Sequence, residues 1–219
     1  MNTLRKNWLR IVVHAGAWIP LAWLVADGLL AQLGAEPIRA IILRTGKSAL
    51  VLLVLSLACT PLNTVAGFRP ALQVRRALGL YAFFYAAIHL TTFVAVDYAL
   101  DLELLREAIF EKPYALVGLA AFSILLPLAL TSTKGSMRRL GQTWRRLHAW
   151  VYLAALLVIV HFVWLVKLDV REPLAYGAIV AALLAIRLSP VRQAIRRVRG
   201  RLAGQYPLPT TRAPSTYLE

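Results

Sequence analysis

The stretch RRALGLYAFFYAAIHLTTFVAVD, residues 75–97, is an apolar run that opens with two arginines and carries a single histidine, His89. A helix needs about 20 mostly apolar residues to cross a bilayer, and this run reaches that length. His89 lies 13 residues after Arg76, which is ~20 Å along a helix that rises ~1.5 Å per residue. The stretch therefore predicts a membrane-spanning helix with an imidazole inside the bilayer, where ionisable side chains are functional candidates by default.

A second stretch, WRRLHAWVYLAALLVIVHFVWL at residues 144–165, repeats this arrangement. Its histidine, His161, lies 15 residues after Arg146, so both imidazoles are ~20 Å in from a basic flank. Two imidazoles at equal depth on two membrane helices can hold a haem iron between them. The alternative is that each histidine is a hydrogen-bond partner between packed helices.

The composition is that of a membrane protein. The 219 residues are 59% hydrophobic and only 16% charged, and the mean hydropathy is +0.64. These values exclude an ordinary soluble domain and predict an all-α, polytopic helical bundle. The single cysteine, Cys59, excludes an internal disulfide and a cysteine-rich metal site. Because the sequence has no CxxCH motif, a haem would be held without a covalent link, as b-type.

Six apolar segments predict six transmembrane helices within one domain, residues 1–190. The sixth segment is the shortest of them. The loop Asp97–Lys112 contains an amphipathic patch, which we expect to lie along the outer surface of the membrane. The segments are Leu9–Leu33, Ser48–Ala66, Leu78–Val96, Pro113–Leu130, Leu147–Leu165 and Leu174–Leu188.

The distribution of charge predicts how these segments are oriented. With a cytoplasmic N-terminus and six crossings, the inner side carries 18 basic residues and one acid, and the outer side 7 basic residues and 9 acids. Cytoplasmic loops are enriched in Lys and Arg, so both termini are expected in the cytoplasm, with His89 and His161 near the outer face. The net charge of +15 is then a topology signal, and we expect no nucleic-acid partner. The basic, Pro- and Thr-containing residues 191–219 form a cytoplasmic tail, either an anchor to membrane lipid or a docking site for a soluble partner.

Arg75 and His148 are candidates for a second site near the inner face. Arg75 precedes His89 by 14 residues, so the two lie ~40° apart on one face of a helix. Arg75 is either a haem-propionate partner, since arginine pairs with carboxylates rather than with iron, or a positive-inside anchor. His148 precedes His161 by 13 residues, ~140° away on a straight helix, and a kink or a π-bulge would bring the two closer. His148 either ligates an inner haem opposite Arg75 or is an interfacial polar residue, and His14 is expected to cap or pack.

Four stretches of the sequence carry a resemblance to a known family. They are GKSALVLLVLSLACTPL (46–62), RRALGLYAFFYAAIHL (75–90), KPYALVGLAAFSILLPLALTS (112–132) and WRRLHAWVYLAALLVIVHFVW (144–164). They resemble the MsrQ family, also called YedZ, and the resemblance extends over nearly all of residues 8–190. That family is the haem-binding membrane subunit of a periplasmic methionine sulfoxide reductase system. It belongs to the wider ferric reductase and NADPH oxidase transmembrane group.

The resemblance implies a ferric reductase-like fold in the bacterial inner membrane, one or two b-type haems and a flavin mononucleotide, FMN. It implies that electrons come from the quinone pool or a cytosolic flavin reductase and pass to a periplasmic, MsrP-like molybdopterin enzyme. Unlike the wider oxidase group, this chain is expected to lack an attached FAD and NADPH domain. The family's ligand positions fall here on His89 and His161. His148 would be a third haem-associated histidine and candidate iron ligand, and Arg75 would carry the arginine contact to a second haem.

We therefore expect transmembrane electron transfer, with no bond-making chemistry in this chain. The protein would supply axial ligands, a low dielectric and a docking face, and the haem would supply the redox step. The alternative is a transporter or scaffold subunit without a redox cofactor, in which the histidines relay protons or pack between helices.

Overall fold

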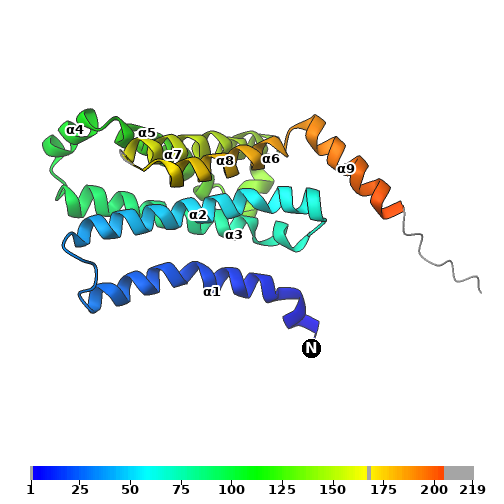
Figure 1. Ribbon diagram of the computed structural model, residues 1–219, viewed down its shortest axis with the longest axis horizontal. Coiled ribbons are helices and arrows are strands. Elements are labelled where there is room, and N and C mark those ends of the chain that lie inside the picture. The colour runs from blue at the N-terminus through cyan, green and yellow to red at the C-terminus, as the bar shows by residue number, and fades with distance from the viewer. Residues whose placement is uncertain (1, 167–168, 205–219) are drawn as a thin grey trace, which may run out of the picture.

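The computed structural model describes residues 2–166 and 169–204, and every regular element within them is a helix (Figure 1). The predicted all-α fold is therefore confirmed. A short π-helix, η1, continues α3 directly. The elements are α1 (Asn2–Leu29), α2 (Pro37–Ala66), α3 (Pro70–Thr91), η1 (Thr92–Asp97), α4 (Leu102–Glu111), α5 (Pro113–Leu130), α6 (Lys134–Ala149), α7 (Val151–Leu165), α8 (Arg171–Ala185) and α9 (Ser189–Gly204).

Five helices in the described part of the chain are long and apolar enough to cross a membrane: α1, α2, α3 with η1, α5, and α6 with α7. A sixth crossing is present if α8 and α9 are counted as one span, but the two are bent by 78° to one another. The uncertain sixth span is the segment that the sequence marked as shortest. Residues 205–219 of the predicted tail lie outside the described residues, and the domain boundary near residue 190 stays a prediction.

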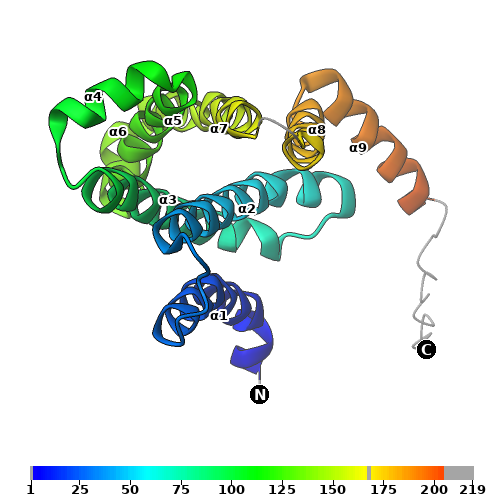
Figure 2. The same ribbon diagram turned by 60° about the vertical axis from the view of Figure 1, so that its left-hand side comes forward.

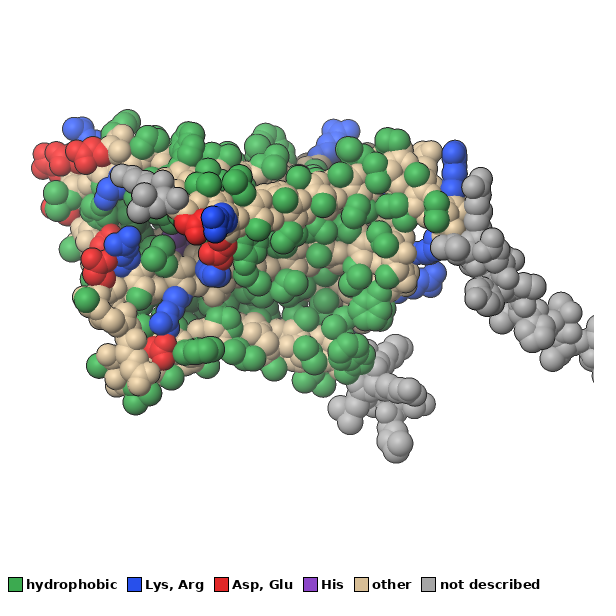
Figure 3. All heavy atoms as spheres, in the orientation of Figure 1, with side chains coloured by type: hydrophobic (Ala, Val, Ile, Leu, Met, Phe, Trp, Pro, Cys, Tyr) green, Lys and Arg blue, Asp and Glu red, His purple; other side chains and the backbone are tan. Residues whose placement is uncertain are grey.

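The helices pack in three levels, as Figures 1 and 2 show. Helix α1 lies against α2 and α3, and α5 to α8 lie on the other side of that pair. We call the end of the bundle that carries α4 the α4 end, and the opposite end, where α9 leaves, the α9 end (Figure 1). Large apolar side chains cover much of the flank seen in Figure 3, while charges gather toward its ends. Such a flank suits the hydrocarbon of a bilayer.

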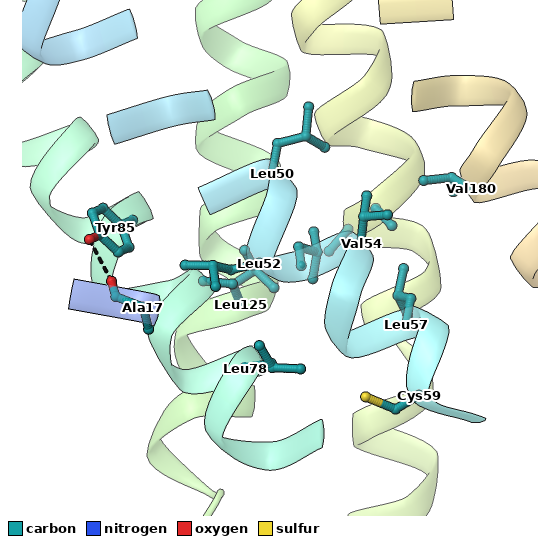
Figure 4. Packing of buried hydrophobic residues seen from close by; sticks show 14 of the residues in the cluster. Ala17, Leu50, Leu52, Val54, Leu57, Cys59, Leu78, Tyr85, Leu125 and Val180 are labelled. Carbon is teal, nitrogen blue, oxygen red and sulfur yellow. Dashed lines mark hydrogen bonds between the residues drawn. The ribbon is translucent and has the colours of Figure 1, made fainter. Parts of the chain in front are cut away.

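The core lies where α2 and α3 meet α5 and α7 (Figure 4). Helix α2 contributes the buried Leu50, Leu53 and Leu57. Ala82 of α3 and Ala154 of α7 are 1% and 0% exposed. Small residues let membrane helices approach closely, so these alanines allow α3 and α7 to pack near the centre of the bundle. Each of the two helices carries its candidate histidine about two turns further on.

A tyrosine hydroxyl attaches α1 to the rest of the bundle. Pro20 interrupts the hydrogen-bond ladder of α1, because proline has no N–H and crowds the preceding turn. The buried Tyr85 of α3 repairs this gap: Leu21 donates its backbone N–H to the Tyr85 hydroxyl at 3.0 Å, and that hydroxyl donates to the Ala17 carbonyl at 2.7 Å (Figure 4). Leu21 and Ala17 are the pair that an unbroken helix would join directly.

Tyr85→Phe is expected to loosen α1 from α3, because it leaves two backbone groups inside the membrane without their partner. Such a loss costs about 1–3 kcal/mol, and each kcal/mol lowers the melting temperature of a protein of this size by about 2–4 °C. Thermal unfolding of the detergent-purified variant measures the shift. Tyr176→Phe in α8, another tyrosine inside a helix, is the control. Equal melting temperatures for Tyr85→Phe and the unaltered protein would contradict this role of the hydroxyl.

Two irregularities interrupt the helices beside the candidate residues. Gly141 inside α6 has φ 49° and ψ −113°, a backbone conformation that glycine tolerates best, and it divides α6 into two parts. Trp150 joins α6 to α7 with helical dihedral angles, φ −63° and ψ −14°, so the kink at Gly141 lies before His148 and not between His148 and His161. The π-helix lies elsewhere, directly after His89 in η1.

An arginine of α9 closes the α9 end of α2. Gly67, which follows α2, adopts the left-handed conformation at φ 70° that commonly ends a helix. The guanidinium of Arg199 donates to the carbonyls of Asn63 and Thr64 at 3.2 and 3.1 Å. Both carbonyls lie in the last turn of α2, where intrahelical partners run out, and the Asn63 carbonyl also accepts from the Gly67 N–H at 3.0 Å. Part of α9 is thus fixed to the bundle by hydrogen bonds.

Candidate cofactor site

The imidazoles of His89 on α3 and His161 on α7 lie opposite one another near the α4 end. Their ring centroids are 6.2 Å apart and their planes are perpendicular, at 90°. Both residues are half-buried within the bundle. The equal depth read from the sequence thus corresponds to direct proximity of the two rings.

A backbone carbonyl holds each ring by the same nitrogen. His89 Nδ1 is 2.8 Å from the Ile42 carbonyl oxygen in α2, and His161 Nδ1 is 2.7 Å from the Tyr114 carbonyl oxygen in α5. A carbonyl only accepts, so Nδ1 carries the hydrogen in both rings. The lone pair of each neutral imidazole is then on Nε2, which is the arrangement seen when a histidine binds a metal.

The distance between the rings fits two imidazoles on one metal ion. Metal–imidazole bonds are about 2 Å long, so two rings on opposite sides of one ion have centroids about 6 Å apart. Within the described residues, no group of three or more His, Cys, Asp or Glu side chains could hold a metal ion. The remaining ligands of such an ion would therefore come from a macrocycle, and the donor set fits the axial positions of a haem.

A glycine makes room for each ring. A Cβ added at Gly46 of α2 would lie 2.9 Å from His89 Nδ1, and one added at Gly118 of α5 would lie 2.7 Å from His161 Nδ1. Each glycine is four residues after the carbonyl that holds the ring, which is the position toward which a helical carbonyl points. Any larger residue there would push the imidazole away from the carbonyl.

The two halves of the site are related by a shift of 72 positions. His89 and His161 differ by 72, as do Gly46 and Gly118, and as do the carbonyl residues Ile42 and Tyr114. The pair α2 and α3 therefore repeats as the pair α5 and α7. Outside such positions the two halves share few identical residues, so this relation is not evident in the sequence.

The α9 end of the same four helices carries the other two predicted residues. Arg75 Nη1 donates to the Thr60 hydroxyl at 3.2 Å, and His148 Nε2 lies 3.4 Å from the Ser132 hydroxyl. Thr60 and Ser132 are also 72 positions apart, and each lies 14 positions after the glycine on its helix. The shift therefore extends to Thr60 and Ser132, with hydroxyls in place of the glycines, whereas the residue 72 positions before His148 is Arg76, one residue after Arg75.

His148 has close partners of its own. Its Nδ1 lies 3.1 Å from the Trp144 carbonyl, and its ring stacks on the Trp144 indole with centroids 3.8 Å apart. His14, for which the sequence predicted capping or packing, packs: its Nδ1 is 2.9 Å from the Tyr81 hydroxyl, and the two rings meet edge to face.

Sequence reasoning gave no site role to Arg187, which follows α8. Its guanidinium donates to the Tyr152 hydroxyl at 2.9 Å and to the Leu57 carbonyl at 2.7 Å, and it lies over the Tyr152 ring. Its Nε is buried and has no hydrogen-bond partner among the described residues. In the sequence Arg187 was one of many basic residues assigned to the inner side, and only packing distinguishes it from the rest.

Sequence reasoning also missed an ion pair between the first two helices. Asp27 of α1 pairs with Arg44 of α2, and their side chains are 13% and 44% exposed. Asp27 lies inside the predicted apolar segment Leu9–Leu33 and Arg44 lies before the predicted segment Ser48–Ala66, so hydropathy gave no reason to pair them. All three ion pairs found in the described part of the chain lie at the α4 end, namely Asp27–Arg44, Glu36–Arg39 and Glu172–Lys47.

Comparison with known proteins agrees with this fold. Residues 45–159 match the family model described as the ferric reductase like transmembrane component, a class of membrane protein built from helices. A protein of Xanthomonas euvesicatoria pv. vesicatoria (strain 85-10) is 45% identical over 185 residues, which cover 82% of this chain and 85% of that protein. One of Rhodospirillum rubrum is 41% identical over 191 residues, covering 87% and 90%. No solved structure matches.

Both relatives carry the name protein-methionine-sulfoxide reductase heme-binding subunit MsrQ. A third relative with this name, from Xanthomonas oryzae pv. oryzae (strain MAFF 311018), is 44% identical over 81% of this chain and 84% of its own length. The chain therefore belongs to the MsrQ family. The resemblance drawn from its sequence is confirmed.

Proposed function

We propose that this chain carries electrons within the membrane to a methionine sulfoxide reductase, through a b-type haem whose axial ligands are His89 and His161. One observation carries the proposal: the two rings are 6.2 Å apart, and each is held by Nδ1 on a backbone carbonyl. The relatives' name, a haem-binding subunit of such a reductase, supports it. When bound, the haem supplies reversible one-electron transfer at its iron.

The protein's own part is to hold the ligands in place. The carbonyls of Ile42 and Tyr114 fix the orientation of the rings and keep Nε2 unprotonated. Gly46 and Gly118 let the rings reach those carbonyls. The surrounding apolar helices exclude water, so the charge change at the iron takes place in a low dielectric.

We propose that Arg75 and His148 serve a second redox site at the α9 end. The level formed by Thr60 and Ser132 repeats the level of the glycines, which supports a cofactor there. Arginine suits a propionate of a second haem or the phosphate of FMN better than it suits iron. This site would take electrons from a cytosolic flavin reductase, and the quinone pool is the other donor that we consider.

We propose that the α4 end faces the periplasm of a bacterial inner-membrane protein, with both termini in the cytoplasm. The electron acceptor would then be a periplasmic, MsrP-like molybdopterin enzyme. The charge bias of the loops supports this orientation. Where α9 lies beside the membrane, its arginines suit anionic lipid headgroups.

The rival function is a transporter or a scaffold, in which the paired histidines relay protons. The visible absorption spectrum distinguishes the two functions. A haem protein purified in detergent shows an intense Soret absorption band that shifts when dithionite reduces it, whereas a transporter is colourless. A colourless protein with correctly formed helices would overturn the proposed function.

His89→Ala and His161→Ala are each expected to lose most of the haem and all electron delivery, since each removes one of two axial bonds. Haem per chain and the reduced spectrum of purified protein measure this. His14→Ala is the control, because it removes a histidine outside the site and should keep both properties. Full haem retention with an unaltered reduced spectrum in both site variants would contradict the assignment.

Gly118→Ala is expected to weaken haem binding while every ligand is still present. The added Cβ displaces His161 from the Tyr114 carbonyl, and loss of such an outer-shell partner typically lowers affinity about 10- to 100-fold. Titration of haem into the haem-free protein gives the affinity. Gly16→Ala is the matched control, since a Cβ there meets nothing within 4 Å. Equal affinities for the two variants would show that the close fit around His161 is unimportant.

His148→Ala is expected to lose about half of the haem if the second site holds one, while the spectrum of the first haem survives. Arg75→Ala is expected to lower the potential of the second centre, because it removes a positive charge in a low-dielectric setting. Redox titration followed by absorbance measures both effects, with Arg76→Ala as the neighbouring control. Unchanged stoichiometry, potential and turnover in both variants would make Arg75 and His148 merely interfacial.

Reporter fusions test the orientation. A reporter that is active only in the periplasm is expected to be inactive after Glu219 and active within Asp97–Lys112, since basic loops stay in the cytoplasm. Activity in whole cells is the measurement, and fusions after Arg139 serve as the cytoplasmic control. Activity after Glu219 would indicate an odd number of spans, with bent α8 and α9 as the first suspects.

A further inference from the structure

Arg187, two residues after the end of α8, places a charge inside the bundle. Its guanidinium donates to the Leu57 carbonyl of α2 at 2.7 Å and to the Tyr152 hydroxyl of α7 at 2.9 Å. Leu57 lies nine residues before Ala66, the last residue of α2, which is ~13 Å along the helix. Because arginine stays protonated in proteins, this part of the bundle holds a permanent positive charge.

A proline explains why the guanidinium binds at Leu57. In an α-helix the carbonyl of residue 57 accepts from the N–H of residue 61, but Pro61 has no N–H. Arg187 supplies the missing donor, as the Tyr85 hydroxyl does for the interrupted turn at Pro20 of α1. A neutral hydroxyl is sufficient in α1, so the hydrogen bond alone does not require a charge in α2.

No carboxylate neutralises this charge in the described part of the chain. All three ion pairs there lie at the α4 end, and the acidic side chains visible in Figure 3 gather toward that end. Arg187 Nε is buried without a hydrogen-bond partner among the described residues. The Tyr152 ring, 5.1 Å from the guanidinium carbon, compensates only part of the charge. Charged side chains inside a membrane are costly and mark functional positions, so we expect the charge itself to have a function.

The guanidinium lies between the level of the glycines and the level of Thr60 and Ser132. On α2 its partner is three residues before Thr60, and on α7 its partner is four residues after His148 and nine before His161. These offsets place Arg187 about one turn from the level of Thr60 and ~13 Å from the level of His161. The charge therefore acts on a cofactor at either level, and buried charges are screened only weakly by salt.

We infer that Arg187 is the fixed charge that raises the redox potential of the haem held by His89 and His161; the inference rests on the proposed function. When ferric iron takes up one electron it becomes ferrous, and the charge at the iron falls by one. A nearby positive charge stabilises the state that has gained the electron. At ~13 Å and an effective dielectric constant of about 20, one charge changes the equilibrium constant for reduction about 10-fold.

The alternative is that Arg187 only ties α8 to α2 and α7. Lysine in its place would keep the charge but lose the rigid fork that reaches both partners. Glutamine would lose the charge but keep a group that can donate to a carbonyl. A structural role depends on the shape of the side chain, whereas the inferred role depends on its charge.

Redox titration of the purified, haem-loaded protein, followed by absorbance, separates shape from charge. Arg187→Gln is expected to lower the equilibrium constant for haem reduction about 10-fold, at high as well as low ionic strength. Arg187→Lys should keep the potential of the unaltered protein, although its melting temperature falls. Arg192→Gln is the matched control, since it removes an exposed arginine from α9 at the same end and should leave the potential unaltered.

A second neutral variant covers the case in which Arg187→Gln does not fold. Pro61→Ala gives the Leu57 carbonyl an N–H partner within its own helix. Arg187→Met in that background then removes the charge without leaving the carbonyl unpaired. The double variant is compared with Pro61→Ala alone, and the same loss in the equilibrium constant is expected.

The outcomes separate this inference from the proposed function. Absence of haem from the unaltered protein would overturn the proposed function itself. If the haem is bound but Arg187→Gln and Arg187→Lys have equal potentials, the charge has no role and Arg187 is only a structural tie. The inference is equally wrong if Arg192→Gln lowers the potential as much as Arg187→Gln does, because the effect would then be one of net surface charge.

Discussion

The structure depends on one constraint. Each imidazole must reach a backbone carbonyl of a neighbouring helix, and that carbonyl already accepts a hydrogen bond within its helix. A carbonyl inside an α-helix accepts from the N–H four residues later, and the side chain at that later position normally shields it. Glycine at Gly46 and Gly118 removes the shield, so His89 and His161 can donate to the same carbonyls from neighbouring helices. The constraint also sets how closely α3 and α7 approach α2 and α5.

The two helix pairs, α2 with α3 and α5 with α7, meet this constraint in the same way. The shift of 72 positions relates the two helix pairs, and the alanines Ala82 and Ala154, also 72 apart, let α3 and α7 approach the centre. At the α9 end, Thr60 and Ser132 lie 14 residues after the two glycines. Their hydroxyls contact Arg75 and His148, whereas the glycines leave space for the histidine rings. The two levels, ~21 Å apart over 14 residues, therefore differ in chemistry although the same four helices build both.

The sequence was sufficient for the fold class, the family and the depth of the paired histidines, because all three depend on hydropathy, spacing and motif. It could not indicate that Gly46 and Gly118 matter, since a glycine in an apolar helix has the same appearance whether or not it faces a ring. The pairing of Asp27 with Arg44 was hidden for a similar reason, as it depends on where α1 packs. The sixth span is the least regular one both in the sequence and in the structure, because α8 is short and α9 turns away from it.

The central proposal is that His89 and His161 would hold one haem iron, and the 90° angle between the rings predicts that their planes would be perpendicular. Low-temperature EPR of the oxidised, purified protein tests this most directly. Two imidazoles in perpendicular planes give a low-spin ferric haem with one strongly anisotropic signal at low field, and this is the predicted spectrum. A high-spin signal, or the three resolved lines of parallel imidazoles, would contradict the account.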